Sequence, residues 1–434
     1  MKLSNFIASL LSTTVLISTH SNALSLKESF ELAQQGDPQI AAAKAEYNAA
    51  IEQIPQARSA LLPNITLDFF SGNSDTTTNG SNTDIDNQGY QLTLSQSLYN
   101  HQLYKLLDQA KAGVAQAAIN YSAQQQALLL RVADRYFKVL AAEDNLSFAI
   151  AEKKAVSKQL QQTKKRFEVG LIAITDVKEA QAQHDITAAQ EIAAQNQLAT
   201  SKEALQVIIN QNVDQLAALP AEIPLKVPAP NDINQWTQTA QQQNLSIKAA
   251  TFALEAAQAG RNASRSGHYP NLSLQATQSN STFDQTTSST DIEDTTISIN
   301  LNIPLYSGGS TSSKSRQAGY KLQQAQSDLL LQQRLATQQT RSAFLGLNAA
   351  IASVKALKQA LISSQSAVEA TQAGFEVGTR TSVDVLNALR NQFRSERDYA
   401  QTRYDYLLNL LKLKQAAGVL DKKDISMIDR WLSE

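Results

Sequence analysis

The chain has four histidines and no cysteine, and its many Ser and Asp residues form no recognisable nucleophile constellation. His20, His101, His184 and His268 are too far apart for metal-ligand spacing, and the absence of cysteine excludes thiolate catalysis, disulfides and Cys-ligated metals. No G-x-S-x-G, H-E-x-x-H or phosphate-binding glycine motif is present. The charges are balanced, with 38 Lys and Arg against 39 Asp and Glu, which argues against nucleic-acid binding. We therefore expect neither an enzyme nor a cofactor.

Two aspartates recur in a repeated motif. The segment FEVGLIAITDV, which begins at Phe167 and contains Asp176, corresponds to FEVGTRTSVDV, which begins at Phe375 and contains Asp384, at an offset of 208 residues. Each aspartate falls in the first turn of a predicted helix, where a carboxylate stabilises the helix N terminus by about 0.3–1 kcal/mol. Thr381 and Asp384 have the spacing of a capping box, with Asp in place of the preferred Glu. Helix capping therefore competes with any functional role for these carboxylates.

The repeat extends beyond this motif. LLPNITL from Leu61 corresponds to HYPNLSL from His268 at an offset of 207 residues, so each half of the chain is one structural unit. Gly170 and Gly378 mark the break between two helices in the two copies of the FEVG motif, and we expect both to end a helix in the left-handed conformation.

Composition divides the chain into segments. Four of the nine prolines lie between positions 220 and 230, a density typical of a linker. The predicted divisions are a signal peptide at 1–23, a first repeat at 24–218, a Pro-rich linker at 219–230, a second repeat at 231–418 and a C-terminal segment at 419–434.

The N terminus has the pattern of an export signal. Lys2 supplies a positive charge, residues 6–17 are mostly apolar, and the small residue Ala23 ends a suitable cleavage sequence. The alternative is an uncleaved anchor, but the apolar run is shorter than the roughly 20 residues that a spanning helix needs. We expect cleavage after Ala23 and export from the cytoplasm.

The segments that must position the aspartates are long helices. Residues 102–168 and 312–376 contain no proline and are rich in Ala, Gln, Leu and Lys, which favour helix. Each stretch would form a rod of about 100 Å at 1.5 Å per residue. No single globular core can bury such a rod, so we expect side-by-side, coiled-coil packing with neighbouring helices.

Four shorter segments have the two-residue period of strands, with apolar side chains on one face and polar ones on the other. They lie at about 62–72, 89–99, 269–283 and 294–305, and loops rich in Ser, Thr, Asn and Asp connect each pair. This alternation is typical of outer-membrane strands, and a soluble sheet with one wet face gives the same pattern.

If these strands span a membrane, one chain is not enough. Four strands cannot close a barrel, and each unpaired edge N–H or C=O group in hydrocarbon costs several kcal/mol. Sheets of several copies would then join edge to edge, with 8, 12 or 16 strands for two, three or four chains. Hydrogen bonding thus predicts an oligomer and leaves its copy number open.

The sequence resembles the TolC family of bacterial outer-membrane exit ducts. The motifs FEVGLIAITDV from Phe167 and GTRTSVDVL from Gly378 resemble the two helix-to-helix turns at the periplasmic tip of that family. The resemblance implies a mainly α fold of two repeats, each helix, β-hairpin, long helix, helix, and a homotrimer. Twelve strands would form one membrane β-barrel, continued by an α-barrel of twelve helices across the periplasm.

The resemblance also assigns residues to a periplasmic constriction. Asp384 aligns with an aspartate ring of the family, in which three copies face the lumen, attract cations and oppose closure by like-charge repulsion. Asn387 stands where a second aspartate ring would lie. We therefore expect a cation-selective entrance with one charged ring instead of two.

A closed-state latch is implied as well. Thr175, Asp176 and Arg380 match positions that link neighbouring coils, and Arg380 could bridge to Asp176 by a charge-assisted hydrogen bond. Phe375 replaces a tyrosine that would donate a hydroxyl hydrogen bond. An exposed link contributes about 0–1 kcal/mol, so we expect a latch that biases the closed state and is looser than the family pattern.

The predicted function is a passive exit duct for tripartite efflux or type I secretion, opened at its tip by docking. The implied partners are outer-membrane lipid, a periplasmic adaptor and an inner-membrane transporter of the RND, ABC or MFS type, with no nucleic acid and no cofactor. The alternative is a periplasmic or surface coiled-coil assembly that forms no channel. Sequence alone leaves open the cargo, the cognate partners and the resting balance between open and closed states.

Overall fold

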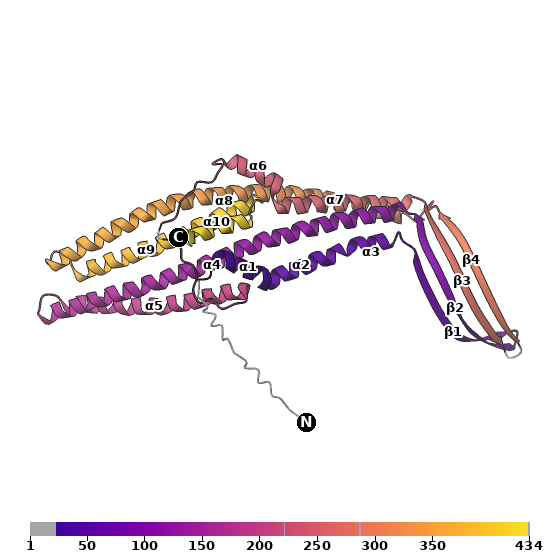
Figure 1. Cartoon of the computed structure of the whole chain (residues 1–434), viewed down its shortest axis with the longest axis horizontal. Coiled ribbons are helices and arrows are strands. Elements are labelled where there is room, and N and C mark those ends of the chain that lie inside the picture. The colour runs from indigo at the N-terminus through magenta and orange to yellow at the C-terminus, as the bar shows by residue number, and fades with distance from the viewer. Residues whose placement is uncertain (1–22, 221, 286–287, 433–434) are drawn as a thin grey trace, which may run out of the picture.

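The computed structural model describes residues 23–220, 222–285 and 288–432. Its long helices run nearly parallel to one axis, and its strands form one sheet at the end of that axis (Figure 1). The predicted signal peptide lies outside the described residues except for Ala23. Within the described residues, none of the helices combines the length and hydropathy needed to cross a bilayer.

The two halves of the chain contain the same succession of elements, namely short helices, a β-hairpin, a very long helix and a shorter helix. The first half consists of α1 (Leu26–Gly36), α2 (Pro38–Ile51), α3 (Gln53–Ser59), β1 (Asn64–Thr78), β2 (Ser81–Tyr99), α4 (His101–Glu168) and α5 (Ile174–Ile209). The second half consists of α6 (Ile233–Gln243), α7 (Leu245–Arg265), the 3-10 turn η1 (Ser266–His268), β3 (Asn271–Gln285), β4 (Ser288–Asn302), α8 (Ser310–Glu376) and α9 (Ser382–Ala416), followed by α10 (Lys422–Leu432).

The two longest helices, α4 with 68 residues and α8 with 67, are about 100 Å long. Asn100 caps α4, because its side chain accepts hydrogen bonds from the backbone N–H groups of Gln102 and Leu103. α4 packs along α5 and α7, α8 packs along α9 and α7, and a contact between α4 and α9 joins the two pairs. Each long helix is therefore supported by partners, as its length requires.

The largest hydrophobic core lies midway along the helices, around Tyr136, Phe137 and Leu407. The Tyr136 hydroxyl lies 3.0 Å from the carbonyl oxygen of Leu24 and 2.9 Å from that of Ala217. Burial raises the pKa of Tyr136, so the hydroxyl stays protonated. This core therefore ties the segment that follows the predicted cleavage site to the long helices.

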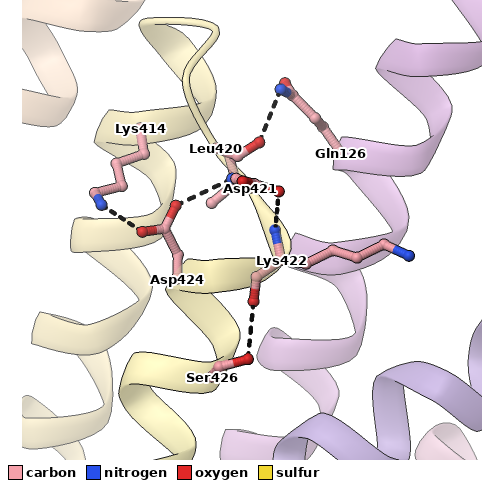
Figure 2. Close-up of polar contacts among 7 residues, drawn as sticks. All are labelled: Gln126, Lys414, Leu420, Asp421, Lys422, Asp424 and Ser426. Atoms are coloured by element: carbon pink, nitrogen blue, oxygen red, sulfur yellow. Dashed lines mark hydrogen bonds and ion pairs between the residues drawn. The ribbon is translucent and has the colours of Figure 1, made fainter.

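The C-terminal helix packs back on the same core. Figure 2 shows the Gln126 side chain of α4 donating to the carbonyl of Leu420 at 3.0 Å, and Lys414 of α9 paired with Asp424 of α10. Asp424 also accepts a 3.0 Å hydrogen bond from the backbone N–H of Asp421. These contacts fix the start of α10 to the end of α9 and the turn before α10 to α4.

The sheet has the antiparallel order β1-β2-β3-β4, and β1 and β4 form its two edges. Cross-strand pairs such as Leu67 with Leu92 and Leu274 with Ile299 place apolar side chains on the same face. This face is bare in the single chain, where Phe69 is 77% exposed and Ile297 is 73% exposed. The helices do not cover it.

The strands run further than the sequence patterns predict. β1 and β2 continue past the predicted limits of 72 and 89 and meet at Asn79 and Gly80, which have φ of +52° and +84°. Asn-Gly with positive φ is typical of a tight hairpin turn, and the β-branched threonines at 76–78 favour strand. Polar composition was therefore a poor guide to where these strands end.

Candidate gate at the paired helix turns

The two copies of the FEVG motif form two helix-to-helix turns at the end of the molecule opposite the sheet (Figure 1). Gly170, between α4 and α5, has φ +72°, and Gly378, between α8 and α9, has φ +84°. The backbone N–H of Leu171 donates to the carbonyl oxygen of Arg166 at 2.9 Å, and the backbone N–H of Thr379 donates to the carbonyl oxygen of Gly374 at 2.8 Å. Both turns thus close the last carbonyls of the preceding helix in the same way.

Asp384 lies in the first turn of α9 and forms the capping box expected from its spacing. Its carboxylate accepts from the backbone N–H of Thr381 at 3.0 Å, and its own N–H donates to the Thr381 hydroxyl at 3.2 Å. The hydrogen bond from the backbone N–H of Thr381 is the main cause that holds the pKa of Asp384 below its ordinary value. The Thr381 side chain and the charge of Arg380 act in the same direction. The carboxylate is therefore ionised near neutral pH.

Asp176, at the equivalent position of the first repeat, has a different environment. The N-cap of α5 is Ala173, which provides no side-chain cap. Among the described residues of one chain, no hydrogen bond or ion pair engages the Asp176 carboxylate, although the side chain is partly exposed. Only one of the two equivalent aspartates is therefore occupied by a cap.

The other residues predicted for the gate lie around these turns. Thr175, Arg380 and Asn387 are exposed. Within the part of one chain that is described, Arg380 and Asp176 form no ion pair. The predicted bridge between these neighbouring coils therefore stays a prediction.

Phe375 is buried, with 2% of its surface exposed, and it packs under a residue that the sequence patterns missed. The Arg166 guanidinium lies 4.1 Å from the centre of the Phe375 ring. It also donates to the carbonyl of Phe375 at 2.8 Å and to that of Glu376 at 3.4 Å. One signal was present in the sequence, since Gly374 occupies the equivalent place in the second repeat and the two copies differ there.

A cluster of buried polar side chains lies about one turn before Arg166 on α4, away from the tip. The Thr163 and Ser382 hydroxyls are 2.7 Å apart, and the Gln159 side chain donates to Ser382 at 3.2 Å. All three residues are buried, and a small apolar cluster that includes Leu160 and Leu386 packs beside them. The first turn of α9 is thus fixed to α4.

Chemically, this end of the molecule offers hydrogen bonds, ion pairs and a carboxylate near a turn. In the described ranges, no group of three or more His, Asp or Glu side chains could hold a metal ion. The arrangement holds the ends of neighbouring helices together.

The family model for outer membrane efflux proteins matches this chain over residues 30–211 and 236–419. These ranges cover both repeats, including the two helix turns. The chain belongs to the outer membrane efflux protein family. The resemblance predicted from the two FEVG motifs is thereby confirmed.

Individual relatives are similar in sequence to this chain over nearly its whole length. The chain is 41% identical to outer membrane protein TolC of Vibrio cholerae over 416 residues, which is 94% of each protein. It is 34% identical to outer membrane protein TolC of Escherichia coli, over 96% of this chain and 87% of that protein. It is 29% identical to the alkaline protease secretion protein AprF of Pseudomonas aeruginosa, over 94% and 87%.

Two solved structures share the fold of this chain. The Campylobacter jejuni CmeC outer membrane channel matches with a TM-score of 0.79 and 16% identity, over 100% of this chain and 97% of that chain. The outer membrane protein VceC of Vibrio cholerae matches with a TM-score of 0.77 and 19% identity, over 91% and 96%. The predicted class, mainly helical with two repeats and a hairpin in each, is confirmed.

Proposed function

We propose that this protein is an outer-membrane exit duct, a passive channel made of three identical chains. The observation that carries the proposal is the incomplete sheet at the end of long helices. Its apolar face is exposed and its edge strands, β1 and β4, each lack a second neighbour in the described chain. The whole-chain similarity to proteins named outer membrane protein TolC supports the same assignment.

Edge pairing makes the oligomer necessary. In hydrocarbon, every N–H and C=O group along β1 and β4 needs a partner, because each bare group costs several kcal/mol. Joining β4 of one copy to β1 of the next satisfies both edges. Three copies give twelve strands in one closed barrel, the copy number that the TolC resemblance implies.

The sheet face fits a bilayer over part of its length. The apolar face carries Phe69 and Tyr90, whose rings are 6.4 Å apart. Further from the helices the same face turns acidic, with Asp84 and Asp86 both accepting hydrogen bonds from Asn73. β2 has 19 residues, or about 60 Å of strand, which is twice the roughly 30 Å of a hydrocarbon core. The acidic half therefore extends beyond the membrane, on the cell exterior.

The helices continue the barrel on the other side. α4 and α8 each extend about 100 Å from the sheet, and three copies of the helix pairs α4–α5 and α8–α9 form a hollow helical cylinder. This part lies in the periplasm. The passage ends at the two turns that carry Gly170 and Gly378.

The gate lies at those turns. Three copies of Asp384 form a ring that favours cations, with Asn387 one helical turn beyond it, and Arg380 of one copy bridges to Thr175 and Asp176 of the next. Ionisation of Asp384, supported by its lowered pKa, provides the charge of the ring. These exposed links bias the closed state without locking it.

The duct works with other proteins and performs no catalysis. The names of the relatives include outer membrane efflux and protease secretion, so the cargo class is drugs or secreted proteins. A periplasmic adaptor and an inner-membrane transporter of the RND, ABC or MFS type complete the pathway, and their docking opens the tip.

Conductance in a planar lipid bilayer tests this proposal. The purified protein should give discrete current steps with a preference for cations. Cell fractionation separates the duct from a structural coiled-coil assembly, since the duct leaves the outer membrane only with detergent. Release by osmotic shock together with an absence of current steps would contradict the proposal.

A further inference from the structure

We propose that Arg166 is a gate residue that acts within each chain, by clamping the α8–α9 turn onto the end of α4. This inference rests on the proposed channel function and adds to it a mechanism of closure. It differs from the predicted links between copies, because Arg166, Phe375 and Glu376 belong to one chain.

Three interactions act together in this clamp. Arg166 donates to the carbonyl groups of Phe375 and Glu376 at 2.8 and 3.4 Å. These carbonyls end α8, where the helix dipole places partial negative charge, so the bonds are charge-assisted. The guanidinium also lies 4.1 Å from the centre of the Phe375 ring, a cation–π geometry. Lysine cannot reproduce this set, because it lacks the planar fork.

The clamp is asymmetric between the repeats. Phe375 is 2% exposed under Arg166, whereas Phe167, its equivalent in the first repeat, is 39% exposed. Gly374 stands in the second repeat where Arg166 stands in the first, so it offers no cation to Phe167. The α4 end therefore holds the α8–α9 turn, and the reverse hold is absent from the described residues. The α8–α9 pair is the one that a release of the clamp would free.

The buried hydroxyl pair, Thr163 of α4 and Ser382 of α9, extends the clamp. The two hydroxyls are 2.7 Å apart in a site closed to solvent, and Gln159 donates to Ser382. If the start of α9 moves away, the Ser382 hydroxyl loses both Thr163 and Gln159, while Thr163 keeps its 2.9 Å hydrogen bond to the carbonyl of Gln159. A buried polar group without a partner is costly, so Ser382 and the Gln159 side chain oppose this movement until water enters. Opening the tip by moving the α8–α9 pair away from α4 must therefore break both the contacts of Arg166 with the end of α8 and the hydroxyl contact with the start of α9.

The first test replaces Arg166 and measures single-channel currents in a planar bilayer. Arg166→Ala should raise the fraction of time spent open by about five-fold or more, the effect of losing one or two strong contacts. Arg166→Lys should give a partial effect. The matched control is Lys165→Ala, which removes the adjacent exposed positive charge and should behave as the wild type.

The second test uses the absence of native cysteine. The double variant Thr163→Cys/Ser382→Cys places two thiols where two hydroxyls are in contact, and oxidation should join α4 to α9. The oxidised channel should show low conductance, and reduction with dithiothreitol should restore the conductance of the wild type. Oxidation should leave the conductance of each single variant unchanged. This test does not depend on whether the Arg166 variants fold.

The outcomes separate the clamp from the channel. Wild-type channels whose conductance is unchanged by Arg166→Ala and by the cross-link would overturn the clamp and leave the channel function intact. An absence of wild-type conductance would overturn the proposed function and the clamp with it. Increased opening of Arg166→Ala together with closure by the cross-link would support both.

Discussion

The Glu152 carboxylate of α4 accepts a 2.8 Å hydrogen bond from the Arg397 guanidinium of α9, and Glu152 is only 2% exposed. This ion pair joins the two helix pairs of one chain between the large hydrophobic core around Tyr136 and the helix turns. A buried carboxylate that loses its cation is left unpaired at low dielectric, which is strongly unfavourable.

Arg397→Ala should therefore destabilise the protein by about 3 kcal/mol, the typical cost of removing one partner of a buried pair. Thermal unfolding of the detergent-solubilised protein, followed by circular dichroism, measures the effect as a lower midpoint. Arg394→Ala is the matched control, because Arg394 lies on the same helix and is exposed. Equal midpoints for the two variants would show that the pair contributes nothing.

Asp384→Asn should reduce cation selectivity, because it removes the single charge that each chain contributes to the predicted ring. The reversal potential across a salt gradient measures selectivity. The pKa of Asp384 is held below its ordinary value by the Thr381 N–H, so wild-type selectivity should persist as the pH is lowered from neutral and weaken only in the acid range where this lowered pKa is reached. The contribution of the capping box to the free energy of unfolding depends on pH in the same direction. It is present above the unfolded-state pKa of Asp384 and is lost as the pH falls through the lower folded-state pKa.

Asn387→Asp is the complementary change. It adds a carboxylate one helical turn after Asp384, on the exposed side of α9, and should increase cation selectivity beyond that of the wild type. If neither position faces the lumen, Asp384→Asn and Asn387→Asp should both leave cation selectivity unchanged, and that result would contradict the predicted ring.

Arg380→Ala should increase single-channel conductance, because the predicted links from Arg380 to Thr175 and Asp176 of the neighbouring copy are lost. The effect should be modest, since an exposed ion pair contributes about 0–1 kcal/mol. Combining it with Arg166→Ala tests independence, because one residue acts between copies and the other within a copy. Unchanged conductance in Arg380→Ala would remove Arg380 from the latch.

Ile299→Arg should reduce the amount of protein in the outer membrane, because it places a charge on the apolar face of β4. Such a substitution costs about 2–4 kcal/mol at the middle of a bilayer. Ser298→Arg, one residue away on the opposite face of the same strand, should be tolerated. Quantitative blotting of detergent-extracted outer membranes measures both, and equal loss in the two variants would contradict the proposed orientation of the sheet.

The features that could be predicted from the sequence are those encoded locally. The repeat was visible in the two FEVG motifs, the long helices in stretches that lack proline, and the helix breaks in Gly170 and Gly378, since glycine adopts positive φ at little cost. The capping box of Thr381 and Asp384 was also visible, because its members are three residues apart.

The features that could not be predicted depend on distant contacts. Arg166 and Phe375 are 209 residues apart. The difference between Arg166 and its equivalent Gly374 marks the position as unusual, but it does not indicate which distant residue Arg166 covers. The sequence suggested only that Phe375 lacks a hydroxyl, whereas its burial under Arg166 gives it a packing role. The strand ends were missed because segments rich in Ser, Thr and Asp resemble loops until cross-strand pairing extends them.

The mass of the intact particle measures how many chains share one barrel. One chain has too few strands to close its sheet, so three chains should complete the barrel. Native mass spectrometry of the protein extracted in detergent should give the mass of three mature chains, with no folded single chain. A folded single chain that stays in solution without detergent would contradict it.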